Sequence, residues 1–222
     1  MRCDRAGRTW ACMMIVAGLM LAGCGGDKKT AGEERTASAV SGLKETRAEL
    51  VAGRTQVDKT VASMNAMRDT QGNLQTEFAT FNQEIKNMNA QAEKTRARSK
   101  DMKARASQYQ AKWREEMGKV EDPTLRAAAT ARANKVRERY DGITAKANEA
   151  RAAYDPFMKQ LQSVQTYLSN DLTPQAVQSA ASVFDKAAAD GKTVNAKIDA
   201  VIAELDDVAT SLTPATAAPA KK

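Results

Sequence analysis

The sequence predicts an all-α protein: an elongated antiparallel four-helix bundle with up-down-up-down topology, coiled-coil seams and no β-sheet. The composition is the first observation, since strong helix formers dominate it and aromatic residues make up only 5% of the chain. The second is periodicity, because apolar residues recur at steps of three and four over residues 37–212. We therefore expect a long, thin molecule with a narrow apolar seam rather than a sphere with a deep pocket.

The first two helices are expected at residues 36–69 and 73–121. The second has the more regular seam, in which apolar or small residues alternate at steps of four and three from Leu74 to Trp113. Residues 69–73 contain Gly72 and several turn formers, and the heptad phase shifts across them. They predict a tight turn, with a continuous helix and a local stammer as the alternative.

The last two helices are expected at residues 123–170 and 174–212. Asp122-Pro123 and Thr173-Pro174 predict their starts, because proline favours the first helical position and the residue before it can cap the helix. Pro156 lies inside the third seam without turn residues around it, so we expect a kink rather than an end. The short connections require neighbouring helices to run antiparallel.

Both ends of the chain differ from the helical region. Residues 1–23 have the layout of a secretory signal peptide, with three arginines followed by an apolar run of about 13 residues, too short to span a bilayer as a helix. Residues 24–35 are small and charged and predict a flexible tether. Residues 213–222 carry two prolines and no periodicity, and we interpret them as a disordered tail.

The signal peptide ends in Leu21-Ala22-Gly23-Cys24, which resembles a bacterial lipobox. The resemblance implies that Cys24 carries covalent acyl and diacylglycerol lipid, and that this anchor holds the protein in the lipid bilayer. Gly25 follows in place of the aspartate that retains such proteins in the inner membrane, which implies the outer membrane, periplasmic face. The alternatives are a plain signal peptide with an incidental cysteine, or an uncleaved anchor.

Other cofactors are not expected. The chain has no histidine, and its remaining cysteines, Cys3 and Cys12, lie in the predicted signal peptide. The mature chain thus lacks the imidazole and free thiolate ligands typical of zinc, copper or haem sites, and no metal site is predicted.

Four segments of the second half suggest a family: AKWREEM (111–117), ERYDGI (138–143), YDPFMKQLQSVQTYLSNDLTPQAV (154–177) and AELDDVATSL (203–212). With them, residues 113–212 resemble an uncharacterised, DUF-type family of bacterial coiled-coil lipoproteins. The resemblance implies a helical fold. It implies no known activity and no catalytic residues.

Basic residues clearly outnumber acidic ones over residues 94–139, and six of them fall close together at the start of this stretch. They predict a surface that contacts anionic lipid headgroups or the cell wall. Nucleic acid is not expected, because the predicted address is periplasmic and no aromatic residues interleave the run. A solvated helix face is the simpler alternative. The six residues are Lys94, Arg96, Arg98, Lys100, Lys103 and Arg105.

Three further patterns have both a functional and a structural interpretation. Small seam residues at Ala92, Thr95, Ser99 and Ala106 could form a groove for a partner helix, or let two helices approach closely. The aromatic residues Tyr109, Trp113, Tyr140, Tyr154 and Phe157 suggest a single core cluster around residue 122 rather than a ligand site. Lys222 ends the chain as the final lysine of the major outer-membrane lipoprotein does, which suggests attachment to peptidoglycan, with a soluble tail as the alternative.

No enzyme is expected. Adjacent carboxylates such as Glu115 and Glu116 point about 100° apart on a helix and do not share a site, and the chain has neither a phosphate-binding loop after a strand nor a nucleophile elbow. We therefore expect a non-catalytic, membrane-anchored lipoprotein that is a structural or spacer element of the bacterial cell envelope. The alternative is a periplasmic adaptor that binds a specific envelope protein through its helical surface. Heptads also permit a homo-oligomer.

Overall fold

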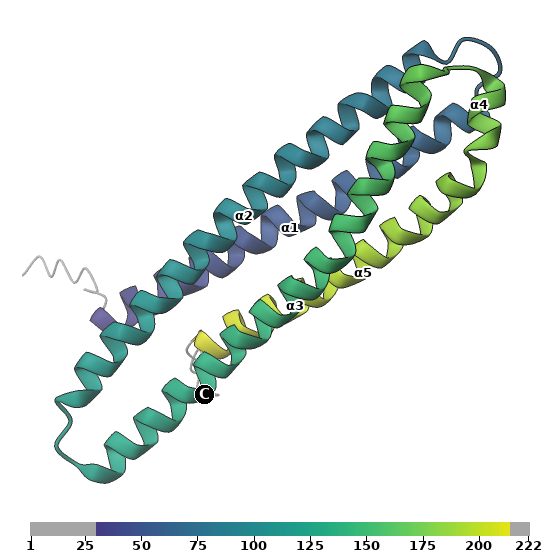
Figure 1. The fold of residues 1–222 in the computed structure, drawn as a ribbon. Helices are drawn as coiled ribbons and strands as arrows, with labels where there is room; N and C mark the ends of the chain where they lie inside the picture. The colour runs from purple at the N-terminus through teal and green to yellow at the C-terminus, as the bar shows by residue number, and fades with distance from the viewer. Residues whose placement is uncertain (1–29, 214–222) are drawn as a thin grey trace, which may run out of the picture.

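The computed structural model describes residues 30–213, which form five α-helices and no strand. They are α1 (Ala31–Asp69), α2 (Gln75–Gly118), α3 (Pro123–Asn170), α4 (Pro174–Ser179) and α5 (Ala181–Leu212). Helix α1 packs against α2 and α5, and α3 packs against α5 and, less extensively, α2. The four long helices thus form a ring of antiparallel neighbours, which confirms the predicted all-α bundle (Figure 1).

Helix α1 begins before the predicted start. The Thr30 hydroxyl accepts a hydrogen bond from the Glu33 backbone N–H at 3.2 Å, and the Glu33 carboxylate accepts one from the Thr30 N–H at 2.7 Å. This reciprocal capping box satisfies two backbone donors that the first turn would otherwise leave free. The predicted tether at 24–35 is therefore wrong from residue 31 onward. Thr30 caps the helix, while residues 24–29 of the predicted tether and the signal peptide lie outside the described residues.

The predicted turns occur where the sequence placed them. Gly72 adopts φ +116°, a conformation that favours glycine, in the connection between α1 and α2. The Asp122 carboxylate accepts a hydrogen bond from the Leu125 N–H at 2.8 Å, and the Thr173 hydroxyl accepts one from the Ala176 N–H at 3.2 Å. Helix α3 continues through Pro156, so this proline does not end the helix, as the sequence predicts.

The predicted last helix, 174–212, is divided. Helix α4 ends at Ser179 and α5 begins at Ala181, with Ala180 between them in αR geometry. No glycine or proline marks this division in the sequence. Ala176, Val177 and Ala180 are all buried in the core, so tertiary packing over the end of the bundle accounts for it.

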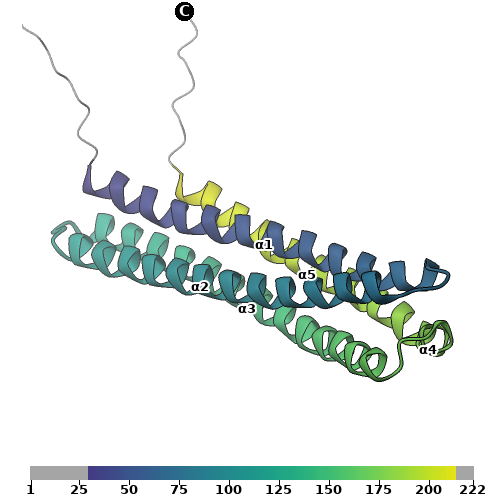
Figure 2. The same ribbon diagram turned by 90° about the horizontal axis from the view of Figure 1, so that it is seen from above.

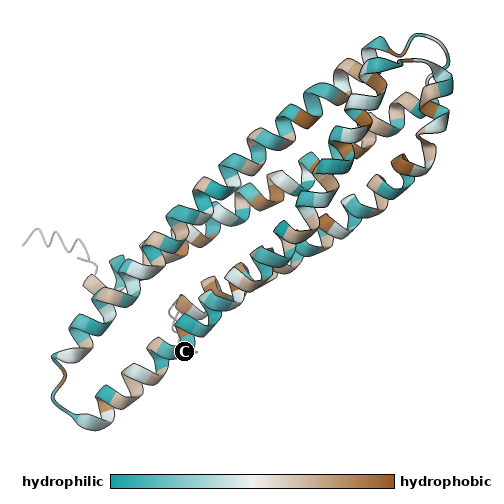
Figure 3. Cartoon of the chain, in the orientation of Figure 1, coloured by the Kyte–Doolittle hydropathy of each residue, from teal (hydrophilic) through white to brown (hydrophobic). Residues whose placement is uncertain are grey.

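The interior contains two apolar clusters, and Figure 3 shows the hydrophobic residues along the inner faces of the helices. The first cluster is built around three fully buried phenylalanines, Phe81, Phe157 and Phe184. The second includes Leu43 of α1, Tyr140 of α3 and Leu205 of α5. It lies nearer the end of the bundle where α1 begins and α5 ends. Every residue of both clusters lies after residue 38, so a chain that starts at residue 25 contains the complete described fold.

The two ends of the bundle differ in what they carry. The start of α1 and the end of α5 lie at the same end as the α2–α3 turn (Figure 2). The opposite end carries Gly72 and α4. Helix α3 has 48 residues, and at a rise of 1.5 Å per residue a helix of that size is about 70 Å long. Within residues 30–213, no helix is long and apolar enough to cross a membrane.

Candidate functional site

The candidate site is a cavity of about 470 Å³ in the middle of the bundle. All four long helices line it, and every exposed side chain of its lining belongs to α2 or α3. It therefore opens between these two helices, which are also the least extensively packed neighbours of the ring. The sequence predicts a long, thin molecule, and this half-open cavity within the elongated bundle was not predicted.

The floor of the cavity is apolar. Val57 of α1 and Val194, Ile198 and Val201 of α5 are all buried and face it, and Met88 of α2 adds a polarisable thioether. Val201 belongs to the second apolar cluster, and the other four residues belong to the first. A ligand in the cavity would thus contact a largely hydrocarbon surface.

Small side chains on two facing walls account for the cavity. Ala92, Thr95 and Ser99 line it from α2, and Ala147 and Ala150 line it from α3. The small residues of α2 were expected to let two helices approach closely. Helix α2 does pack extensively against α1, but it packs much less extensively against α3. On the α3 side, side chains this short leave the space between the two helices unfilled.

The contact between α1 and α2 is sealed by hydrogen bonds. The Gln91 side-chain amide donates to the backbone carbonyl of Glu49 at 3.0 Å, and the Thr95 hydroxyl lies 3.4 Å from the same oxygen. The Thr46 hydroxyl of α1 donates to the backbone carbonyl of Gly42 in its own helix at 2.9 Å and lies 3.3 Å from the backbone carbonyl oxygen of Arg98 in α2. These polar groups of the cavity lining are therefore already satisfied within the protein.

Tyr154 stands at the cavity with its ring half-buried. Its hydroxyl donates to the Met88 carbonyl at 3.5 Å. Burial raises the pKa of Tyr154 to about 12, against a smaller opposing effect of Arg96. The phenol is therefore neutral at ordinary pH and adds no negative charge to the site.

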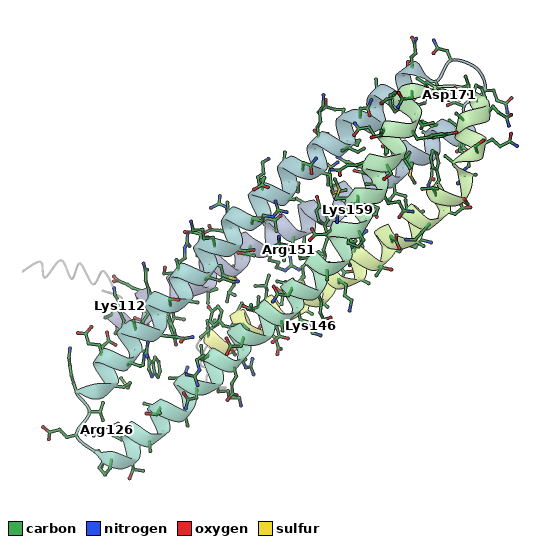
Figure 4. All side chains as sticks on the ribbon, viewed as in Figure 1. Lys112, Arg126, Lys146, Arg151, Lys159 and Asp171 are labelled. Carbon is green, nitrogen blue, oxygen red and sulfur yellow. The ribbon has the colours of Figure 1, made fainter. Side chains whose placement is uncertain are left out.

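Three of the six predicted basic residues lie at the cavity: Arg96, Lys100 and Lys103. Their spacing of four and three residues places them on one face of α2. Arg151 of α3 also lines the cavity, on the side of α3 that faces α2 (Figure 4). Sequence reasoning missed Arg151, because only the packing of α3 against α2 brings it to the same opening.

The charges at this opening are only partly neutralised. Arg96 pairs with Glu93, and Arg151 Nε lies 3.6 Å from an Asp155 carboxylate oxygen, both within one helix. Lys100 and Lys103 form no ion pair with any described residue. No aspartate or glutamate of the described chain lines the cavity. Its opening is therefore electropositive.

The other predicted basic residues point elsewhere. Guanidinium nitrogens of Arg98 and Arg105 lie 3.2 Å and 3.1 Å from Glu45 carboxylate oxygens of α1. A hydrogen bond from Ser41, together with Arg105 and Arg98, lowers the pKa of the Glu45 carboxyl from its ordinary value. Lys94 is exposed on α2 and does not line the cavity. Arg98 and Arg105 thus belong to an ion-pair cluster with Glu45, and Lys94 is an exposed residue outside the cavity. The other three predicted residues lie at the cavity opening.

The predicted aromatic cluster is also divided. Tyr109 and Tyr140 belong to one apolar cluster and Trp113 packs against it, whereas Phe157 belongs to the other and Tyr154 packs against that one. Tyr109 and Trp113 stack at 6.0 Å between ring centroids, and the Arg35 guanidinium carbon lies 5.6 Å from each centroid. These cation–π contacts join the first turns of α1 to α2.

Within residues 30–213, no group of three or more histidine, cysteine, aspartate or glutamate residues could hold a metal ion. The lipidation residue Cys24 and the peptidoglycan candidate Lys222 lie outside the described residues, and both stay predictions.

A family model described as "Protein of unknown function (DUF2959)" matches residues 26–212. The match extends well beyond the segments that carry the sequence resemblance and includes the residues that line the cavity. Neither a curated protein nor a solved structure matches the chain.

Proposed function

This chain belongs to the DUF2959 family, whose function is unknown, and we propose that it is a non-catalytic lipoprotein anchored by Cys24 in the outer membrane, facing the periplasm. In this proposal it is a structural or spacer element of the cell envelope. The observation that carries the proposal is that α1 begins and α5 ends at one end of the bundle (Figure 2). Lipid at Cys24 would hold that end at the bilayer. The opposite end, with Gly72 and α4, would then stand up to about 70 Å away.

The chemistry of the anchored end supports this orientation. Leu125, in the first turn of α3, is 63% exposed, and Lys119 and Arg126 flank it. The same turn carries Glu121 and Asp122, so its charges balance, and the exposed leucine is the group that suits the membrane interface. Insertion of Leu125 into the interface would thus add to the hold of the lipid anchor.

The spacer role accounts for the exposed surface better than the adaptor role does. The large exposed apolar side chains of the described residues are Val51, Leu125, Tyr167 and Val183, which are spread over α1, α3 and α5. A specific protein interface usually has a contiguous apolar centre. Scattered single residues are normal for a solvated surface.

The position of the C-terminal end limits what Lys222 can do in this arrangement. At no more than about 3.6 Å per residue, residues 213–222 reach about 35 Å beyond Leu212, roughly half the length of the bundle. Attachment of Lys222 to peptidoglycan would therefore take place nearer the membrane than the far end of the bundle.

Envelope fractionation with intact mass measurement tests the anchor. We expect the wild-type protein in the outer-membrane fraction with the mass of a chain that starts at Cys24 plus acyl groups. The Cys24→Ala variant should be neither cleaved at this site nor acylated. A soluble wild-type protein without acyl mass would contradict the proposal. Muropeptide mass that is lost when Lys221 and Lys222 are deleted would add the wall link.

A further inference from the structure

We propose that the cavity between α2 and α3 binds one single-chain amphiphile with an anionic head, with its tail inside the bundle and its head at the opening. This inference goes beyond the spacer role. It rests on residues of the described bundle and does not depend on where the protein is anchored. Four observations carry it: the size, shape and lining of the cavity, and the charge at its opening.

The size fits one long acyl chain. The cavity volume of about 470 Å³ lies within the roughly 300–1,000 Å³ of small-molecule sites. An apolar cavity of about 150 Å³ holds one six-carbon ring, so this cavity has room for roughly eighteen carbon atoms. A diacyl lipid would need about twice that space.

The shape is long and narrow. The lining of α2 extends from Met88 to Lys103, and at a rise of 1.5 Å per residue this stretch is about 22 Å long. A volume of about 470 Å³ spread over that length makes the cavity narrow. The cavity therefore suits an extended hydrocarbon chain.

The lining favours a tail without polar groups. Its floor is aliphatic, and the hydroxyls of Thr46 and Thr95 and the amide of Gln91 already have partners inside the protein. A sugar or nucleotide buried here would leave its own polar groups without partners, which is unfavourable. A hydrocarbon chain that binds here removes apolar surface from water and needs no hydrogen-bond partners.

The opening selects the head. Lys100 and Lys103 have no ion-pair partner among the described residues, and Arg96 and Arg151 add two guanidinium groups, each paired once within its own helix. No acidic side chain in this part of the chain lines the cavity. A carboxylate or phosphate head would receive charge-assisted hydrogen bonds here, a neutral head would receive weaker ones, and a cationic head would be repelled.

Binding is measured with the chain of residues 25–222, which contains every residue of both apolar clusters. Three probes with the same oleoyl tail are titrated by calorimetry, and the stoichiometry is read by native mass spectrometry: oleate, oleoyl lysophosphatidylglycerol and neutral monooleoylglycerol. We expect a one-to-one complex with at least one anionic probe and an affinity about tenfold or more lower for the neutral one. Binding of oleate alone would indicate a free fatty acid, and binding of the lysolipid alone a phospholipid product.

Two pairs of variants locate the site. Lys100→Gln with Lys103→Gln should weaken anionic binding about tenfold or more. Lys94→Gln with Lys112→Gln removes the same charge from α2 outside the cavity and should leave the affinity unchanged. Ala92→Phe with Ala147→Phe fills the cavity and should abolish binding. Ala97→Phe with Ala145→Phe makes the same changes at exposed positions of the same helices and should retain it.

The proposal is overturned if none of the three probes binds, or if the neutral probe binds as tightly as the anionic ones. It is also overturned if a cavity-filled variant with a native helical spectrum keeps the wild-type affinity. Should the cavity-filled variant fail to fold, the comparison of the two lysine pairs decides, since those four side chains are all exposed.

Discussion

At the residue scale, Tyr140 is a buried phenol whose hydroxyl has no hydrogen-bond partner within residues 30–213. It is 7% exposed, and burial raises its pKa to about 12. A buried hydroxyl without a partner loses its hydrogen bonds to water and gains none in return. The ring of Tyr140 therefore stabilises the apolar cluster around it, while its oxygen opposes that effect.

The first stability prediction follows from this oxygen. We expect Tyr140→Phe to raise the free energy of unfolding by about 1 kcal/mol, because the ring stays and the unpaired hydroxyl is removed. Urea denaturation at neutral pH measures the change. Tyr154→Phe is the matched control, since the Tyr154 hydroxyl reaches the Met88 carbonyl and its loss should bring no such gain. A lower stability of Tyr140→Phe would show that the hydroxyl has a partner after all.

Part of the candidate site can be predicted from single residues of the sequence. The spacing of Arg96, Lys100 and Lys103 already places them on one helix face, and the small residues of the second seam are visible in the sequence. Arg151 could not be predicted, because its role depends on how α3 lies against α2. The facing small residues Ala147 and Ala150 in the third seam were the available signal for an unfilled space.

At the element scale, glycines determine how closely the helices approach. A Cβ atom at Gly191 of α5 would lie 3.0 Å from Val61 Cγ2 and 3.4 Å from Val57 Cγ1 of α1. A Cβ atom at Gly53 of α1 would have only Gln91 Cγ nearby, at 3.9 Å. The same substitution should therefore have opposite effects at the two positions.

We expect Gly191→Ala to lower the free energy of unfolding by about 1–3 kcal/mol, because the stiff valine side chains of α1 cannot yield without moving the helices apart. Gly53→Ala should raise it by up to about 1 kcal/mol, since alanine favours the helix and meets no clash. Thermal and urea denaturation measure both variants. Equal effects of the two substitutions would show that helix propensity, not the contact between α5 and α1, sets the stability at Gly191.

Helix positions were largely predictable where a local signal marks them. Asp122-Pro123, Thr173-Pro174 and Gly72 are local devices, and α3, α4 and the first turn follow from them. The start of α1 was missed because the capping box at Thr30 and Glu33 lies in a polar segment that composition alone interprets as a tether. The division at Ala180 has no local signal, since it depends on packing over the end of the bundle.

At the scale of the whole molecule, the chain folds back three times and gives the bundle two unlike ends. One end carries the start of α1, the end of α5 and the α2–α3 turn, and the other carries the α1–α2 connection with Gly72 and α4 (Figures 1 and 2). A single long helix with lipid at one end would present its C-terminus far from the membrane. In the proposed arrangement this bundle presents a turn and a short helix there instead.

The proposed orientation is tested most directly with the acylated protein in vesicles, spin-labelled at one end or the other. Single cysteines replace Thr124 in the first turn of α3 and Gln71 at the opposite end, both exposed positions. We predict that the label at residue 124 is accessible to oxygen dissolved in the bilayer, while the label at residue 71 stays in water, about 70 Å away. Equal accessibility of the two labels, or greater lipid contact at residue 71, would contradict a bundle that stands on the end with the α2–α3 turn.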